Sequence, residues 1–266
     1  MVVVSTHGLR ASLRDRGTEG SLGDRAAFFQ VFFAREYDFL LSRVSPGDIV
    51  IDAGANVGWF SLLASRLVGP KGLVIAIEPE PSNADCLRTN IALNDVTNVI
   101  VIERALDAIP DKTVHIVGTG AMAHVGETGP AVTTITLDNI LDGLSINQVG
   151  AIKMDIEGAE KLVFGVKSAS MTLAVARAVA VEIHDLEGAG VVRSRLRADG
   201  YTYVSEVKPE SEFLMRSMQE GVRRLDLVLK LYGTDVVAVM GRMLAGAVER
   251  RPRSGSDTMG LVYASR

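Results

Sequence analysis

Four carboxylates and one histidine stand at or just after the ends of short apolar runs in this 266-residue chain. They are Asp52, Glu78, Asp155, Glu182 and His184. Such side chains accept hydrogen bonds from hydroxyl and ammonium groups, hold cations, or take up a proton. If the apolar runs are parallel strands of one sheet, the residues that follow them meet at a single edge. The spacing therefore predicts one polar site assembled from strand ends.

A glycine-rich turn follows the first of these runs and reads Asp52-Ala53-Gly54-Ala55-Asn56-Val57-Gly58. Gly54 lets the backbone approach a cofactor without a side-chain clash, and Gly58 permits close packing of the next helix, whose start offers unpaired N–H groups. Glu78 closes the second run, where a carboxylate can accept hydrogen bonds from both hydroxyls of a ribose. The combination predicts an adenosine cofactor. The residues expected to hold it are Asp52, Gly54, Asn56, Gly58 and Glu78, with Asp155 nearby. The alternative is a bare strand-to-helix turn whose glycines serve packing alone.

The residue between the glycines indicates which adenosine cofactor to expect. Asn56 stands where the dinucleotide fingerprint has its middle glycine, which lies against a pyrophosphate. Asp52 would repel a diphosphate but attract an ammonium group, and the methionine part of S-adenosylmethionine carries one beside its sulfonium. The pattern therefore favours S-adenosylmethionine, with a nicotinamide-dependent oxidoreductase as the weaker alternative.

Asp155, Glu182 and His184 are the candidate catalytic residues. Glu182 and His184 lie two residues apart and so share one face of a strand. Methyl transfer to a hydroxyl requires in-line alignment and a route for the hydroxyl proton, for which His184 is a candidate base. The alternative for this histidine is a hydrogen-bonded structural role. The three residues could also hold Mg²⁺, which the sequence neither requires nor excludes.

Three residues around Asp155 carry weaker signals. Lys153 is either a further base or part of an ion pair on the sheet. Glu160 is expected to begin a helix, where a carboxylate is favoured by the helix dipole, and the role of Glu157 stays open.

Two further residues are candidates for the cofactor site. Asn83 either orients Glu78 or caps the following helix. Ala105 lies just past the third strand, where a backbone amide can meet adenine without leaving a side-chain signature.

The elements that must position these residues alternate along the chain. We expect helices at 28–41, 59–68, 82–93, 159–166 and 190–198, and strands at 48–52, 73–77, 99–102, 152–155, 178–183, 201–204 and 261–264. Apolar strands between amphipathic helices predict an α/β fold, a Rossmann-like, doubly wound and mostly parallel sheet. Glycines between 118 and 131 predict a hairpin or loop.

The expected organisation is a single domain over 28–266, preceded by a loosely ordered leader at 1–27. Apolar stripes at helical spacing over 208–258 predict a helical hairpin inserted before the last strand. It is either a lid over the acceptor, a dimerisation element or a packed decoration.

Composition narrows the class of protein. The net charge of −4 lacks the basic excess that nucleic-acid binding needs, so no nucleic-acid partner is expected. The single cysteine, Cys86, fits a reducing cytoplasm, and neither a signal peptide nor an uninterrupted membrane span is visible. A cytoplasmic protein is expected, and a homo-oligomer stays open.

The chain resembles a known family, the FkbM-type methyltransferases, across roughly residues 46–205. The matching segments are Gly47 to Gly58, Glu78-Pro79 with Asn83 and Asn90, Thr136-Leu137-Asp138, Ile152 to Glu160, and Glu182-Ile183-His184. The block Lys153-Met154-Asp155-Ile156-Glu157-Gly158-Ala159-Glu160 is the most specific of these, because many methyltransferases share the first glycine motif.

The resemblance implies a seven-stranded class I fold and S-adenosylmethionine-dependent O-methyl transfer. The implied acceptor is a small molecule, a hydroxyl on a sugar or a polyketide-like natural product. A partner subunit that binds S-adenosylmethionine without turnover is the alternative from another class.

Overall fold

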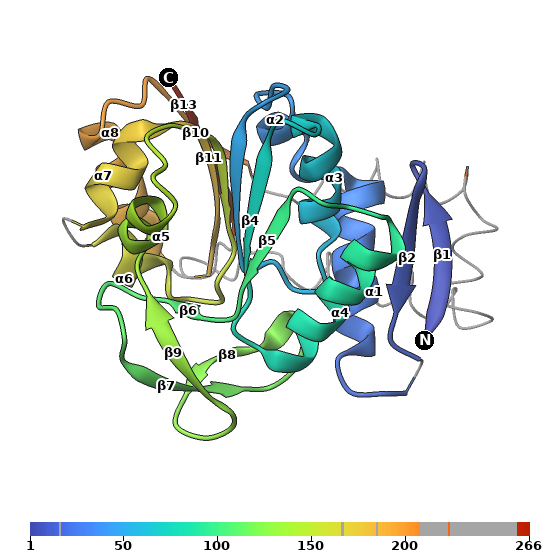
Figure 1. The fold of residues 1–266 in the computed structure, drawn as a ribbon. Coiled ribbons are helices and arrows are strands. Elements are labelled where there is room, and N and C mark those ends of the chain that lie inside the picture. Colours follow the sequence, from blue (N-terminus) through green and yellow to red (C-terminus); the bar gives the residue numbers. More distant parts are fainter. Residues whose placement is uncertain (16, 166–167, 185, 208–222, 224–259) are drawn as a thin grey trace.

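The computed structural model describes residues 1–15, 17–165, 168–184, 186–207, 223 and 260–266. Within these residues seven strands form one central sheet in the order β12-β13-β11-β10-β3-β4-β5. β13 runs antiparallel to both of its neighbours, whereas the other adjacent strands are parallel. The predicted α/β fold with a doubly wound, mostly parallel sheet is confirmed (Figure 1).

The strands of this sheet lie close to their predicted positions. Their bounds are β3 (Ile49–Ala53), β4 (Leu73–Ile77), β5 (Val99–Ile102), β10 (Val149–Met154), β11 (Ala176–Ile183), β12 (Tyr203–Val207) and β13 (Gly260–Ser265). β10 is buried along its whole length and has one charged residue, Lys153. Near-continuous apolar sequence of this kind is what a parallel strand covered on both faces requires.

Helices cover both faces of the sheet (Figure 1). One face carries α1 (Ser21–Phe29), α3 (Trp59–Val68) and α4 (Pro81–Leu93). The other carries α5 (Leu137–Gly143), α6 (Glu160–Phe164), α7 (Ser168–Val175) and α8 (Leu186–Ala198). Two apolar clusters hold these layers on the sheet, one with Trp59 and Leu62, the other with Phe164 and Val192.

The carboxyl ends of the parallel strands lie at one level. Ala53, the last residue of β3, pairs with Ile77 at the end of β4 and with Met154 at the end of β10. The next residues along each segment therefore emerge at the same edge of the sheet. This is the edge at which the sequence predicted the polar site.

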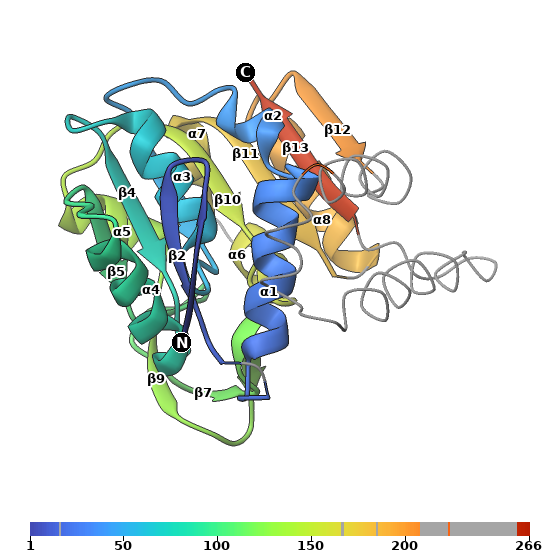
Figure 2. The same cartoon turned by 90° about the vertical axis from the view of Figure 1, so that its right-hand side faces the viewer.

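Residues 1–27 are not the loosely ordered leader that the sequence indicated. β1 (Val2–Thr6) and β2 (Leu9–Leu13) form an antiparallel hairpin, and α1 follows. The Ser12 backbone N–H donates to Oδ1 of Asn90 in α4 at 2.7 Å, and Figure 2 shows the hairpin outside the helix layer. The alternation of apolar and polar residues in β2 spans too few positions to stand out among the neighbouring glycine, serine and arginine.

The helix predicted over 28–41 is broken into three pieces. α1 ends at Phe29, a π-helical segment η1 covers Gln30–Ala34, and α2 covers Asp38–Leu41. Arg35 lies between them with a φ of 56°, a left-handed conformation that ends a right-handed helix. The apolar spacing of three and four residues persists through the break, so the sequence pattern gave no sign of it.

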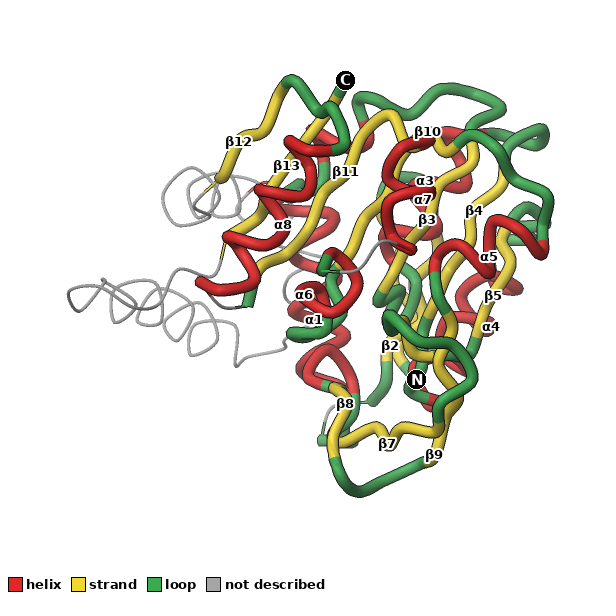
Figure 3. Tube along the Cα trace, turned by 90° about the vertical axis from the view of Figure 1, so that its left-hand side faces the viewer, coloured by secondary structure: helices red, strands yellow, loops and turns green. Residues whose placement is uncertain are grey.

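A second sheet follows β5 and has the strand order β6-β9-β7-β8. Its strands are β6 (Ala105–Leu106), β7 (Thr113–Val117), β8 (His124–Gly126) and β9 (Ala131–Ile135), with the 3₁₀ turn η2 (Gly120–Met122) between β7 and β8. β7 and β8 pair antiparallel, which confirms the predicted hairpin in this region. Figure 3 shows this small sheet at one end of the molecule, beyond the central sheet.

The predicted helical insertion at 208–258 lies outside the described residues, apart from residue 223, so its role as a lid or dimerisation element stays a prediction. Among the helices that are described, none has the length and apolar character needed to cross a bilayer.

Candidate active site

A cavity of about 410 Å³ lies at the carboxyl edge of the central sheet. Its walls come from the turn after β3, from the ends of β4, β10 and β11, and from α1 and η2 on the outside. α1 and η2 pack backbone to backbone, because a Cβ on Gly23 would lie 2.7 Å from the backbone nitrogen of Ala121. The volume suits a small molecule or a cofactor.

Glu78 is the most fully bonded carboxylate of this cavity. It accepts hydrogen bonds from the backbone N–H groups of Asn56 at 2.6 Å and Glu80 at 3.0 Å, and from Nδ2 of Asn83 at 3.2 Å. Burial raises the pKa of Glu78 to about 7, although these hydrogen bonds oppose the rise. Its carboxylate retains lone pairs that can accept hydrogen bonds from a ligand.

Asn83 orients Glu78 and does not cap α4. The N-cap is Glu80, whose carboxylate accepts the backbone N–H of Asn83 at 2.7 Å. The Asn83 amide donates to Glu78 and, at 3.0 Å, to the carbonyl of Gly120, while its oxygen accepts a hydrogen bond from Arg14. The described contacts thus favour the first of the two predicted roles.

The glycines of the turn are required by protein contacts. A Cβ on Gly54, which has a φ of 75°, would collide with the backbone oxygen of Asp155. A Cβ on Gly58 would collide with the side chain of Leu87, and Gly58 itself does not line the cavity. Gly58, which the sequence also placed in the cofactor site, therefore serves helix packing, whereas Gly54 and Asn56 line the cavity.

Asp52 lies beneath the cavity and does not line it. Its carboxylate is fully buried, accepts a hydrogen bond from Ser61 at 2.6 Å, and lies 3.4 Å from Nζ of Lys153. Lys153 also donates to the carbonyl oxygen of Gly54 at 2.7 Å. The ion-pair interpretation of Lys153 is confirmed. Burial acts to lower the pKa of Lys153, but the charges of Asp52 and Asp155 raise it overall, which favours the ammonium form.

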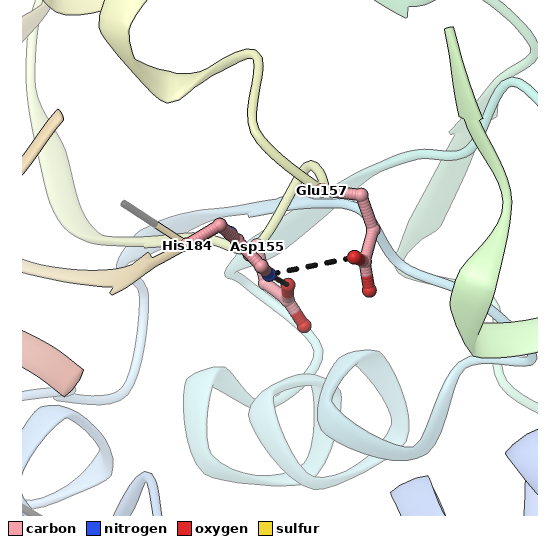
Figure 4. Close-up of side chains that lie close together, drawn as sticks. All are labelled: Asp155, Glu157 and His184. Atoms are coloured by element: carbon pink, nitrogen blue, oxygen red, sulfur yellow. Dashed lines mark ion pairs between the residues drawn. The ribbon is translucent and has the colours of Figure 1, made fainter. Parts of the chain in front are cut away.

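The second group of site residues gathers around His184, which directly follows β11. Nε2 of His184 lies 3.7 Å from Oδ1 of Asp155 and 3.5 Å from Oε2 of Glu157, while Nδ1 lies 3.3 Å from Oε1 of Glu160 (Figure 4). Burial acts to lower the pKa of His184, but Glu160 and the other two carboxylates raise it to about 9. In this arrangement the imidazole is charged at neutral pH.

Glu182 lines the cavity but stands apart from this group. The three described side chains that come together closely enough to share a cation, with ligand atoms within 4.8 Å, are Asp155, Glu157 and His184. The Mg²⁺ set that the sequence left open had Glu182 in the place of Glu157, whereas the structure brings Glu157 to Asp155 and His184. Burial and the nearby charges of Asp155 and Glu36 raise the pKa of Glu182 well above its usual range.

The sequence missed several side chains at the site. Arg14 lies in the segment that was expected to be a loosely ordered leader. Tyr37 lines the cavity but lies within the range predicted to be one continuous helix. Glu160 begins α6 as predicted, but its contact with His184 had no sequence signal. Ala105 is 2% exposed and lines the cavity, while its contact with adenine stays a prediction.

Comparisons with known proteins place the chain in a family. The family model described as "Methyltransferase FkbM domain" matches residues 52–203, more than half of the chain. The 31-O-demethyl-FK506 methyltransferase FkbM of Streptomyces tacrolimicus is 30% identical over 208 residues, 63% of this chain and 77% of the relative.

Two solved structures illustrate the likeness of the backbone. An S-adenosylmethionine-dependent O-methyltransferase from Thermotoga maritima is 14% identical, with a TM-score of 0.48 over 92% of this chain and 71% of that chain. An rRNA methylase from Streptococcus thermophilus is 11% identical, with a TM-score of 0.46 over 87% of this chain and 94% of that chain. At these scores neither likeness bears on the substrate. The family match confirms the resemblance seen in the motifs, and the chain belongs to the FkbM family of S-adenosylmethionine-dependent methyltransferases.

Proposed function

We propose that this chain transfers a methyl group from S-adenosylmethionine to a hydroxyl group of a small molecule, a sugar or a polyketide-like natural product. The observation that carries the proposal is a cavity shared by Asn56 and Glu78 on one side and by Asp155, Glu182 and His184 on the other. The relative whose name describes O-methylation of 31-O-demethyl-FK506 supports a hydroxyl as the acceptor.

The side of the cavity at β3 and β4 fits the cofactor. Glu78 has lone pairs free for ribose hydroxyls, and the backbone of Ala105 is our candidate for adenine. Oδ1 of Asn56 is buried without a hydrogen-bond partner among the described residues, so a donor such as the cofactor's ammonium group would satisfy it. When bound, S-adenosylmethionine supplies a methyl group activated by its sulfonium sulfur.

Asp52 acts through other residues in this proposal. The structure brings its carboxylate to Lys153 and Ser61 and not to the cavity surface. Lys153 in turn holds the carbonyl of Gly54, so Asp52 fixes the turn on which the cofactor lies. This positioning role replaces the direct contact with the ammonium group that the sequence indicated.

The side of the cavity at β10 and β11 handles the acceptor. Among the three predicted catalytic residues, Asp155 and His184 pair with each other, and His184 also pairs with Glu157. Glu182 lines the cavity and stands apart from these ion pairs of the described residues. We therefore assign to Glu182 the uptake of the acceptor's hydroxyl proton, and to Asp155 and His184 the orientation of that hydroxyl.

Calorimetry followed by a methyl-transfer screen tests the proposal. We expect the purified protein to bind S-adenosylmethionine and S-adenosylhomocysteine but not NAD. Radiolabelled methyl should then pass to glycosylated or polyketide alcohols. The corresponding methyl ethers, which offer no hydroxyl, should stay unlabelled. Cofactor binding without transfer to any acceptor would indicate the non-catalytic partner subunit, and labelling of an amine or a carbon would overturn O-methylation.

Other expectations stay predictions. These are the absence of a nucleic-acid partner, a cytoplasmic location and the open question of a homo-oligomer. Magnesium dependence likewise rests on the donor chemistry of the acidic residues alone.

A further inference from the structure

Three side chains from separate segments converge at the acceptor side of the cavity. Asp155 directly follows β10, Glu157 belongs to the turn after it, and His184 directly follows β11. One potential ligand atom from each lies within 4.8 Å of the others, and Figure 4 shows the three groups facing one another. All three line the cavity, so a cation held by them would face a bound small molecule.

Carboxylates lie beside both ring nitrogens of His184. Nδ1 of His184 is buried and lies 3.3 Å from Oε1 of Glu160 without a hydrogen bond of good geometry to a described residue, and Nε2 lies beside Asp155 and Glu157. Glu160 is 3% exposed and is itself held by the backbone N–H of Ile156 at 2.9 Å. A carboxylate behind one imidazole nitrogen commonly fixes the ring so that the other can bind a metal.

Two further features indicate that the protein alone does not satisfy this group. Oδ1 of Asp155 is buried and has no hydrogen-bond partner among the described residues. Glu157 has a φ of 52°, a left-handed conformation that a residue with a side chain rarely adopts and that is most often kept at functional sites. Both residues are thus held in costly states at the point where the three side chains meet.

The charges around the three residues are also unbalanced. Glu160 and Glu182 add two carboxylates to those of Asp155 and Glu157. The positive charges beside them are the imidazolium of His184 and Lys153, which lies 3.7 Å from Asp155 and is also paired with Asp52. Carboxylates that are gathered without enough positive charge repel one another. A divalent cation that takes the place of the proton on Nε2 of His184 would add one net positive charge and reduce that repulsion.

We propose that Asp155, Glu157 and His184 bind a divalent cation of the class that accepts mixed carboxylate and imidazole ligands, represented by Mn²⁺. Mg²⁺ prefers oxygen ligands throughout, whereas an imidazole nitrogen shifts preference toward the first-row transition metals. Three protein ligands leave coordination positions open on the cavity side. Resting on the proposed function, the ion would bind the acceptor's hydroxyl oxygen and lower its pKa, which eases transfer of its proton to Glu182.

The test is a titration of the chelator-treated full chain with Mn²⁺, followed by the electron paramagnetic resonance signal of free Mn²⁺. We expect one Mn²⁺ per chain, bound at least about tenfold more tightly than Mg²⁺ in competition. Pulsed measurements should show a ¹⁴N coupling from an imidazole ligand. His184→Ala should abolish that coupling, and Glu157→Gln should weaken Mn²⁺ binding at least about tenfold.

Glu103→Gln is the matched control, since Glu103 is a half-exposed carboxylate that is paired with Arg88 and does not line the cavity. It should bind Mn²⁺ like the unaltered protein. Absence of stoichiometric binding by the unaltered chain, or equal binding by Glu157→Gln and His184→Ala, would overturn the metal site. If a variant loses its circular dichroism spectrum, the Mg²⁺ competition and the ¹⁴N coupling of the unaltered chain decide alone.

The outcomes separate this inference from the proposed function. S-adenosylmethionine binding is measured in the presence of EDTA, where the metal site is empty by design. Cofactor binding without Mn²⁺ binding would remove the metal site and leave the methyltransferase proposal standing. Mn²⁺ binding without cofactor binding would remove the methyltransferase proposal and leave the metal site standing.

Discussion

The two sides of the cavity hold their carboxylates in opposite ways. Glu78 accepts three N–H donors, two of them from the backbone. Asp155 and Glu157 face a histidine that is shared with a third carboxylate, Glu160. A site made from backbone donors is fixed by the fold and suits one constant ligand, whereas a site made from mutually repelling side chains is completed by what binds there.

The strongest test of this contrast is Glu182→Gln. The substitution keeps the shape of the side chain but removes the proton acceptor, so kcat should fall by about 10²- to 10⁴-fold. S-adenosylmethionine affinity should not change. Single-turnover methyl transfer and calorimetry measure the two quantities, with Glu187→Gln, an exposed carboxylate beside Lys161, as the control. A parallel loss of cofactor affinity would instead assign Glu182 to the cofactor side.

Glu78→Gln should act on the other side of the cavity alone. Hydrogen bonds to a charged acceptor contribute about 1.5–3 kcal/mol, so S-adenosylmethionine should bind roughly 10- to 100-fold more weakly. At saturating cofactor kcat should stay near its original value. Calorimetry and initial rates measure this, and an unchanged affinity would remove Glu78 from the cofactor site.

The pH dependence should distinguish the two sides more finely. Below its pKa of about 7 Glu78 carries a proton and accepts hydrogen bonds less well, so cofactor affinity should rise about tenfold from pH 6 to pH 8. Glu78→Gln should flatten this rise. If the variant keeps the full pH dependence, another group is responsible.

The same shift also sets the sign of a stability effect. Between the ordinary value of 4.5 and about 7, the folded protein keeps a proton on Glu78 that the unfolded chain has lost. Without ligand, the contribution of Glu78 to stability therefore falls as pH rises through this window. Thermal unfolding of the unaltered chain and of Glu78→Gln, compared across this range, should show a shallower slope for the variant.

The smallest effect is expected from the residues behind Glu78. Asn83→Ala removes a neutral donor, and Arg14→Lys keeps the charge beside Asp24 but loses the fork that reaches Asn83. Each should weaken cofactor binding about 2- to 10-fold. Because Arg14 acts through Asn83, the double variant should be no worse than Asn83→Ala, and additive losses would contradict that coupling.

The residues on the cofactor side of the cavity, at β3 and β4, could be predicted from the sequence. Gly54, Asn56 and Glu78 sit at fixed offsets from strands whose apolar runs are plain in the sequence, so strand ends and turn chemistry located them. Asp52 shows the limit of that reasoning. The carboxylate of Asp52 forms an ion pair with the buried Lys153 of the neighbouring strand β10. The order of residues in the turn could not reveal this contact.

The acceptor side depended on contacts between distant segments. Glu157 was left open and Glu160 was read as a helix start, because nothing local says that His184 will lie between them. Tyr37 lines the cavity because the chain changes direction at a π-helical segment and at Arg35, which has a left-handed conformation. Both preserve the apolar spacing of an ordinary helix. Periodicity reports which face is buried, and here it could not report where the chain bends.

The place of β13 has a consequence for how the molecule assembles. This strand follows β11 and β12 in sequence yet lies between them, pairing Ser265 with both Ala178 and Tyr203. Its pairing with β11 spans a long stretch of chain, and contacts of that kind form late in folding. Until it inserts, β11 presents an open edge that another unfinished chain can occupy, so refolding yield should depend on protein concentration even though the finished sheet conceals that edge.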